Sequence, residues 1–199
     1  MEATKKTKFV DTIIESLRKA AIEMEELQVQ VALGKYEARD SYDVAKKKFN
    51  LFLHDSKSKI VTGKEKVDEI HTRIDELNVQ LNLGKAETME AFQAQRKKLL
   101  IALHELEVTI NTNRNLKSIY AYLLIQIEIF KVQLEILEQK FDSGSETAKD
   151  SFEKGKQEFN QLIDKMKAKY TKEEPTKWEH FSTEISEAIT HLKHAFVKQ

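Results

Sequence analysis

Hydrophobic residues recur along most of the chain at alternating intervals of three and four positions, which places them on one face of an α-helix. Two such runs end just before Gly34 and Gly84. No run follows the period of two that indicates a β-strand. Each run therefore predicts a helix with one face to bury. Their apolar positions are Val10, Ile13, Leu17, Ala20, Met24, Leu27 and Val31 in the first, and Val67, Ile70, Ile74, Leu77 and Leu81 in the second.

The two runs belong to an internal repeat. Segments 26–37 and 76–87 match at eight of twelve positions, and setting Gly144 on Gly34 reveals a third copy. Self-similarity at such a period is the signature of a repeated helical unit. The sequence thus predicts three helical hairpins, about 8–60, 64–112 and 115–170, and a final helix over 176–197. In the third copy Ala148, Asp150, Ser151, Lys156, Phe159 and Asn160 fall on Ala38, Asp40, Ser41, Lys46, Phe49 and Asn50.

Whether helices end at the repeat glycines decides between two maps. Asp142 to Ser145 form a strong turn around Gly144, and acids follow each glycine, as suits the start of a new helix. Against a break, Gly34 lacks a Ser, Thr, Asp or Asn cap, and glycine inside a helix costs only about 1 kcal/mol. We expect a break with positive φ at Gly144, and the same geometry at Gly34 and Gly84. The favoured map has seven helices, about 8–33, 36–60, 64–83, 86–110, 115–142, 146–170 and 176–197, and five if the first two glycines are bridged.

One predicted helix, 115–142, carries two apolar seams instead of one. A helix of this kind must be covered on two sides. We expect it to be wrapped by the chain's own hairpins, with docking to another chain as the alternative. The first seam is Leu116, Tyr120, Leu123, Ile127, Phe130, Leu134, Leu137 and Phe141, and the second is Tyr122, Ile125, Ile129, Val132 and Ile136.

Composition agrees with a single all-α domain over residues 1–199, an antiparallel helical bundle or coiled coil. Charged residues make up 33% of the chain, with five Gly and one Pro, which is typical of long helices with solvated faces. The formal net charge is +0, so no global field attracts nucleic acid. The absence of cysteine excludes disulfides and thiol chemistry. No transmembrane or secretory segment is predicted, and the expected location is the cytoplasm.

Histidines are the candidates for metal or proton chemistry. Asp68 and His71 have the i, i+3 spacing of di-iron bundles, but a second pair is missing. Val67, Ile70 and Ile74 take the core positions, which leaves Asp68 and His71 on the flank of the helix, so we expect no metal site. His54 and His104 occupy equivalent repeat positions, where the third copy has Asp164. We interpret them as polar surface positions. His191 and His194, which could hold a surface metal weakly, are interpreted as solvated.

The chain contains none of the common phosphate-binding or hydrolase motifs, and we expect neither catalytic residues nor a cofactor. Two basic runs, 46–48 and 96–98, could contact phosphate. Each spans nearly a full helical turn with acids nearby, so a solvated helix surface is the favoured interpretation.

Segment 83–99, LGKAETMEAFQAQRKKL, resembles the repeat of small bacterial coiled-coil proteins of undetermined biochemistry, some of them described as stress-associated. The C-terminal stretch 178–196 is similar to the tail of such proteins. The resemblance implies a helical-repeat fold and assigns no functional residues.

The sequence supports three hypotheses for the function. The favoured hypothesis is a non-enzymatic structural protein that presents helical surface to a protein partner or to itself. The alternative is an amphipathic coat whose arms open onto lipid or a hydrophobic granule, which the lack of basic flanks disfavours. A metal-binding bundle comes third. Neither the partner nor the oligomeric state can be predicted from the sequence.

Overall fold

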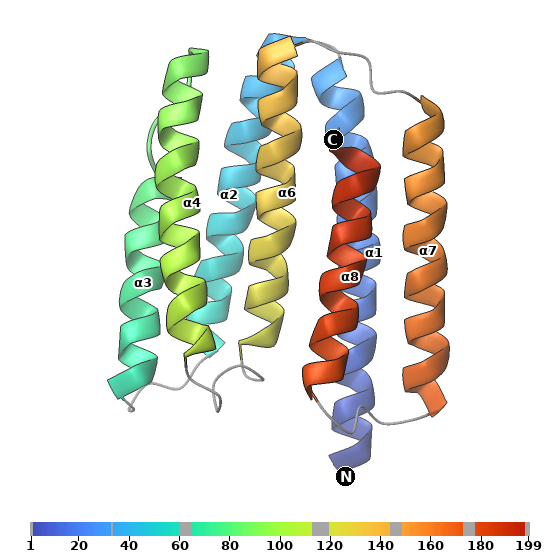
Figure 1. Cartoon of the computed structure of the whole chain (residues 1–199). Helices are drawn as coiled ribbons and strands as arrows, with labels where there is room; N and C mark the ends of the chain where they lie inside the picture. Colours follow the sequence, from blue (N-terminus) through green and yellow to red (C-terminus); the bar gives the residue numbers. More distant parts are fainter. Residues whose placement is uncertain are drawn as a thin grey trace. The chain divides into compact units, whose positions relative to one another are not determined.

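The computed structural model describes residues 2–32, 34–59, 65–112, 120–143, 149–172 and 178–197. Across these ranges the chain forms seven helices and no strand, which confirms the all-α prediction (Figure 1). None of the helices in the described ranges combines the length and the hydropathy needed to cross a membrane. The helices are α1 (Glu2–Ala32), α2 (Lys35–Lys59), α3 (Glu65–Leu81), α4 (Met89–Asn111), α6 (Ala121–Ser143), α7 (Lys149–Lys172) and α8 (Trp178–Phe196).

The chain breaks at Gly34, as predicted. Gly34 has φ 147°, a region that residues with a Cβ rarely adopt. Its carbonyl accepts the first hydrogen bond of α2, from the Ala38 N–H at 3.1 Å. Gly34 is therefore the N-cap of α2, a position where glycine is almost as favourable as a residue with a capping side chain. The missing Ser, Thr, Asp or Asn is thus no obstacle to a break.

The chain also breaks at Gly84, but by a different geometry. Positive φ was expected there, and that expectation is wrong, because Gly34 is the only glycine with positive φ among the described residues. Helix α3 ends at Leu81, and α4 begins at Met89, capped by Thr88, whose hydroxyl accepts the Ala91 N–H at 3.2 Å. The break spreads over an extended connection, so no single residue must turn the chain. The five-helix map is excluded, and Gly144 lies outside the described residues.

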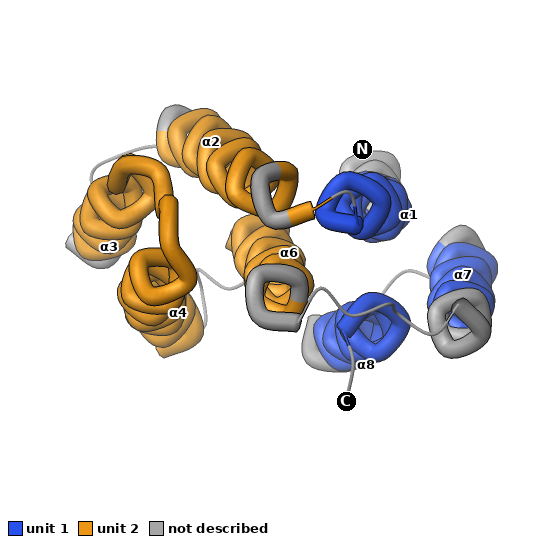
Figure 2. The backbone as a smooth tube through the Cα atoms, turned by 90° about the horizontal axis from the view of Figure 1, so that it is seen from above, with its two compact units in different colours: residues 1–32, 145–199 blue, residues 33–144 orange. Residues whose placement is uncertain are grey.

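The helices form two compact units, unit 1 (Met1–Ala32 and Ser145–Gln199) and unit 2 (Leu33–Gly144), coloured separately in Figure 2. Only the middle repeat keeps both of its helices, α3 and α4, in one unit. The first repeat contributes α1 to unit 1 and α2 to unit 2, and the third divides α6 from α7. The repeat in sequence is therefore not the unit of packing, and a single domain stays a prediction.

Unit 1 is a three-helix arrangement in which α1, α7 and α8 all contact one another. Ion pairs fix the register of α1 on α7: Arg18 meets Asp164 at 2.6 Å, and Glu25 meets Lys156 at 2.7 Å. Because the residue numbers rise along α1 while they fall along α7, the two helices are antiparallel. The α1 seam predicted from Val10 to Val31 is buried throughout.

Unit 2 contains α2, α3, α4 and α6, with contacts between α2 and α3, α3 and α4, α4 and α6, and α6 and α2. The stacked rings of Phe49 and Phe130, 4.3 Å apart, join α2 to α6. A side-chain hydrogen bond of 3.0 Å between Asn50 and Asn82 sets α2 beside the end of α3. This closed ring of four contacting helices encloses the aromatic core of the unit.

Helix α6 is buried on two adjacent faces, as its two seams predict. In the first seam the described residues from Tyr120 to Leu137 are buried. In the second, Ile125, Ile129, Val132 and Ile136 are each at most 4% exposed, whereas Tyr122 is half-buried. The apolar pattern of this segment thus predicted its burial correctly.

Candidate functional site

The metal candidate Asp68 and His71 is divided between the surface and the core. Asp68 is exposed, whereas His71 is buried, which corrects the prediction that both lie on the flank. His71 lies one position after Ile70 and joins the edge of the same buried face. In the part of the chain that the structure describes, no three His, Asp or Glu side chains are grouped so that they could hold a metal ion.

The four further histidines singled out in the sequence, at positions 54, 104, 191 and 194, lie at the surface. His54 and His104 are exposed on α2 and α4. Asp164, their equivalent in the third copy, forms the ion pair with Arg18. His194 is exposed, and the His191 Nδ1 lies 3.8 Å from the Glu158 carboxylate, which joins α8 to α7. The surface interpretation of these positions agrees with their exposure.

The first basic run is divided between core and surface. Lys46 is only 3% exposed, while Lys47 and Lys48 are exposed. The interpretation of the whole run as solvated is therefore wrong for Lys46. On α2, Lys46 follows Tyr42 by one helical turn and lies next to Ala45, and both of these neighbours belong to the buried seam.

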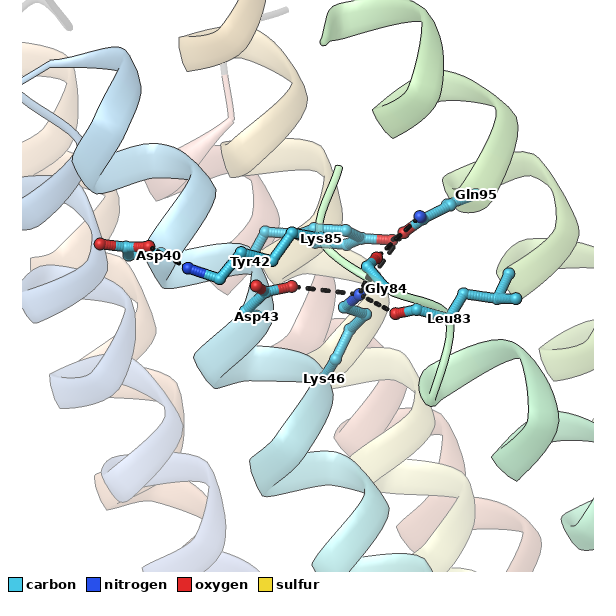
Figure 3. A network of polar contacts seen from close by, with 8 residues as sticks. All are labelled: Asp40, Tyr42, Asp43, Lys46, Leu83, Gly84, Lys85 and Gln95. Carbon is cyan, nitrogen blue, oxygen red and sulfur yellow. Dashed lines mark hydrogen bonds and ion pairs between the residues drawn. The ribbon is translucent and has the colours of Figure 1, made fainter. Parts of the chain in front are cut away.

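Lys46 is the centre of a polar cluster that we call the Lys46 clamp (Figure 3). Its ammonium donates to the Leu83 carbonyl at 2.9 Å and to the Gly84 carbonyl at 3.3 Å, and it pairs with Asp43 at 3.1 Å. These carbonyls follow the end of α3, where the helix leaves acceptors unsatisfied and favours a positive charge. The clamp therefore fixes the connection after α3 onto α2.

Gln95 extends the clamp to α4. Its amide donates to the Gly84 carbonyl at 2.9 Å, while its carbonyl oxygen accepts from the Tyr42 hydroxyl at 3.2 Å and from Lys46 at 3.4 Å. Burial, and second the charge of Asp43, raise the pKa of Tyr42 above its ordinary value, so the hydroxyl keeps its proton and donates. The ammonium also lies 4.6 Å from the centre of the Tyr42 ring. Every group in the clamp has a partner within the fold, as is typical of a structural network.

The position of Lys46 carries a base in all three repeat copies, and in each copy this base is paired. Arg96 meets Glu138 of α6 at 2.9 Å, and Lys156 meets Glu25 of α1 at 2.7 Å. The alignment of the repeats held this signal, because a base kept at one position beside the seam indicates a partner on a neighbouring helix. The basic run at 96–98 is thus also only partly solvated.

A second polar cluster joins α4 to α6. The Lys131 ammonium lies 2.6 Å from a carboxylate oxygen of Glu107 and 2.9 Å from one of Glu128, so the two carboxylates are held close together by one cation. Burial first, and then the hydrogen bond from Glu128, raise the pKa of Glu107 to about 7, although Lys131 acts in the opposite sense. Burial lowers the pKa of Lys131, but its bonds to the two carboxylates outweigh this, and the net shift is upward.

An open groove of about 470 Å³ adjoins this cluster. The two carboxylates that line it already bind Lys131, which neutralises one of their charges. The groove therefore offers few unengaged groups that would fix a small molecule. Its lining consists of His104, Glu107, Val108, Asn111, Thr112 and Glu128.

The most unusual surface feature is a set of exposed apolar side chains with helical spacing. They form three pairs, each seven residues apart on one helix: Ile22 and Val29 on α1, Val44 and Leu51 on α2, and Ile101 and Val108 on α4. We call these the outer pairs. Residues seven apart lie two turns apart on one face, about 10 Å along the axis. Two repeat positions carry exposed apolar residues in two copies. Leu51 (71% exposed) matches Ile101 (51%), and Val29 (67%) matches Val79 (63%) of α3, which lies outside the pairs.

The outer pairs were not predicted from the sequence, because apolar periodicity indicates the buried seams and the outer pairs lie outside them. The repeat alignment held the signal, since Val29 and Val79 are identical although both lie off the buried seam. Comparison with protein-family models, curated proteins and solved structures finds no match for this chain.

Proposed function

We propose that this protein is a non-enzymatic interaction protein, which presents the outer faces of its helices to a protein partner. The outer pairs are the observation that supports this function. A single exposed apolar side chain needs no explanation, but apolar side chains grouped on a folded surface indicate a binding site. Pairs spaced by seven residues provide the narrow apolar stripe that a partner helix contacts.

The polar clusters support the same function by a second route. The Lys46 clamp and the Lys131 cluster join α2, α3, α4 and α6 through groups that are already paired. A framework fixed in this way holds the outer faces of α2 and α4 in place before a partner arrives, which lowers the entropy cost of binding. The polar clusters hold the helices in position, and the outer faces remain available to bind a partner.

The experiment is a comparison of partner capture from the native cell by matched variants. Leu51→Glu and Ile101→Glu place a charge in the outer pairs, while Gln93→Glu adds the same charge at an exposed polar position of α4. All three should keep the helical circular dichroism spectrum, because the altered side chains are exposed. We expect the captured partner to be lost with one or both outer-pair variants and kept with Gln93→Glu.

The proposal would be refuted if all four proteins captured the same partners in the same amounts. Loss of binding with Gln93→Glu as well would point to a general effect of charge. Vesicle flotation of the wild-type protein, run in parallel, addresses the coat hypothesis, since a protein partner requires no lipid for binding.

A further inference from the structure

The three outer pairs differ in the residues that lie between them. Each pair brackets two residues on the same face, three and four positions after its first member. These are Glu25 and Glu26 on α1, Lys47 and Lys48 on α2, and His104 and Glu105 on α4. Only the α4 pair brackets residues of unlike chemistry.

This difference decides which face can bind a copy of itself. When two identical helices pack antiparallel about a two-fold axis, the two residues at the centre of the contact meet each other's counterparts. On α1 this places Glu26 against Glu25, which is already paired with Lys156 and gains nothing from a second acid. On α2 it places lysines against lysines, which is destabilising. On α4 it places the imidazole of His104 against the carboxylate of Glu105, a donor against an acceptor.

The rest of the α4 face fits the same arrangement. The axis that pairs His104 with Glu105 also sets Ile101 opposite Val108 of the second copy, so both outer side chains are covered. Lys97 and Lys98 then meet the neutral side chains of Thr112 and Asn111. No like charges are opposed along this register.

Glu105 already accepts from Arg73 of α3 at 3.0 Å. A carboxylate has two oxygens with room for about four hydrogen bonds, so a second donor can be accommodated. The pairing with Arg73 also orients the carboxylate before association.

We propose that the outer face of α4 is a self-association site that binds the same face of a second copy of this chain in antiparallel orientation. Ile101 of each copy contacts Val108 of the other, and His104 contacts Glu105. This rests on the proposed function and names its partner as the protein itself. One helix face from each copy is smaller than a standard stable interface, so the dimer is weak and exchanges quickly.

Cysteine cross-linking tests the orientation, because the wild-type chain has no cysteine. Ile101→Cys protein carrying an affinity tag is mixed with untagged Val108→Cys protein and oxidised under mild conditions. Antiparallel packing predicts mixed disulfides well above those between identical variants. Val44→Cys mixed with Leu51→Cys on α2 is the control pair and should react only at the rate of random collision.

Three results would overturn the proposal. Disulfides mainly between identical variants would show parallel packing. Equal reaction of the α2 control would show collision or a different face. A complete absence of cross-links at high protein concentration would show that α4 does not self-associate.

Sedimentation of charge variants tests the chemistry of the site. Ile101→Glu should weaken self-association by about tenfold or more, corresponding to about 1.4 kcal/mol, while the repeat-equivalent Leu51→Glu should leave it unchanged. His104→Glu should also weaken it, because it opposes two acids. Adding Glu105→Lys to that variant restores opposite charges and should recover the dimer. Failure of this rescue would contradict the assigned contact.

The same variants separate this inference from the proposed function. If the wild-type protein is monomeric but the Ile101→Glu variant loses a captured partner, the interaction function stands and only self-association is refuted. A chain that neither dimerises nor loses a partner with any outer-pair variant refutes both.

Discussion

Replacing the buried lysine of the clamp by methionine should destabilise the protein markedly. Methionine fills the volume of the aliphatic stem, so Lys46→Met removes the ammonium and leaves little cavity. The variant loses the ion pair with Asp43 and three hydrogen bonds, to the carbonyls of Leu83 and Gly84 and to the side-chain oxygen of Gln95. A hydrogen bond to a charged group contributes about 1.5–3 kcal/mol, and a buried acceptor left without a donor costs about 1–3 kcal/mol.

These contributions overlap, because the same carbonyls count as lost bonds and as unsatisfied acceptors, and Gln95 still donates to Gly84. We therefore expect the free energy of unfolding to fall by about 2–4 kcal/mol. Urea denaturation followed by circular dichroism measures this change. Hydrogen exchange should show faster exchange at the amides of residues 82–88, where the clamp holds the connection.

Lys47→Met is the matched control, since the neighbouring lysine is exposed and its replacement should change stability by less than about 0.5 kcal/mol. Equal, small effects of Lys46→Met and Lys47→Met would contradict a stabilising role of the Lys46 clamp. They would mean that the clamp contributes nothing that the rest of the fold does not supply.

Three further predictions concern the backbone, the carboxylate pair and the core. Gly34→Ala should destabilise by more than about 1 kcal/mol because of the positive φ, whereas Gly84→Ala, with open space at the new Cβ, should change stability little; thermal unfolding compares them. Because the pKa of Glu107 is raised to about 7, this carboxyl group stabilises the fold below about pH 4.5, and the stabilisation is lost as the pH rises to about 7. The free energy of unfolding of Glu107→Gln, relative to wild type, should therefore increase by about 1–3 kcal/mol between pH 4 and pH 8. A stability difference between the two proteins that does not change with pH would refute this. Phe49→Ala should cost about 3–5 kcal/mol in urea denaturation, because it leaves a cavity against Phe130, and a loss below about 0.5 kcal/mol would contradict the packing.

The sequence was sufficient for the helices and for their buried faces. Periodicity at three and four positions identifies the seam of α1 and both seams of α6, because apolar side chains must leave water wherever the helices are placed. It also predicted the breaks near Gly34 and Gly84, since acids follow each glycine and the matching repeat position at Gly144 lies in a run of turn formers. The difference in geometry between the two glycines was not predictable, because it depends on which residue caps the next helix.

The polar clusters were harder to predict than the core. Residues 46–48 are three identical lysines, and the position of the carbonyls that follow α3 makes only Lys46 a buried donor. The pair Glu107 and Lys131 meets across two helices, and periodicity within one helix carries no information about such a meeting. The sequence does contain one signal, because a basic residue recurs at the repeat position of Lys46, and in the structure each of these bases is paired with an acid.

The resemblance to bacterial coiled-coil repeat proteins stays a hypothesis. The packing adds a fact that the repeat alone did not suggest, because the first and third repeats each contribute one helix to either unit. Helices that are equivalent in sequence therefore have different neighbours. Even so, two exposed positions carry apolar residues in two copies of the repeat, Leu51 with Ile101 and Val29 with Val79.

Methyl NMR spectroscopy tests most directly whether the outer faces bind partners. Selectively labelled protein gives separate signals for the outer methyl groups of Leu51, Ile101 and Val108 and for the core methyl groups of Ile70. On addition of native-cell extract, or on raising the protein concentration, the outer signals should shift or broaden while the Ile70 signals stay unchanged. Outer signals that are identical in dilute buffer, in concentrated solution and in extract would contradict binding of any partner at the outer faces.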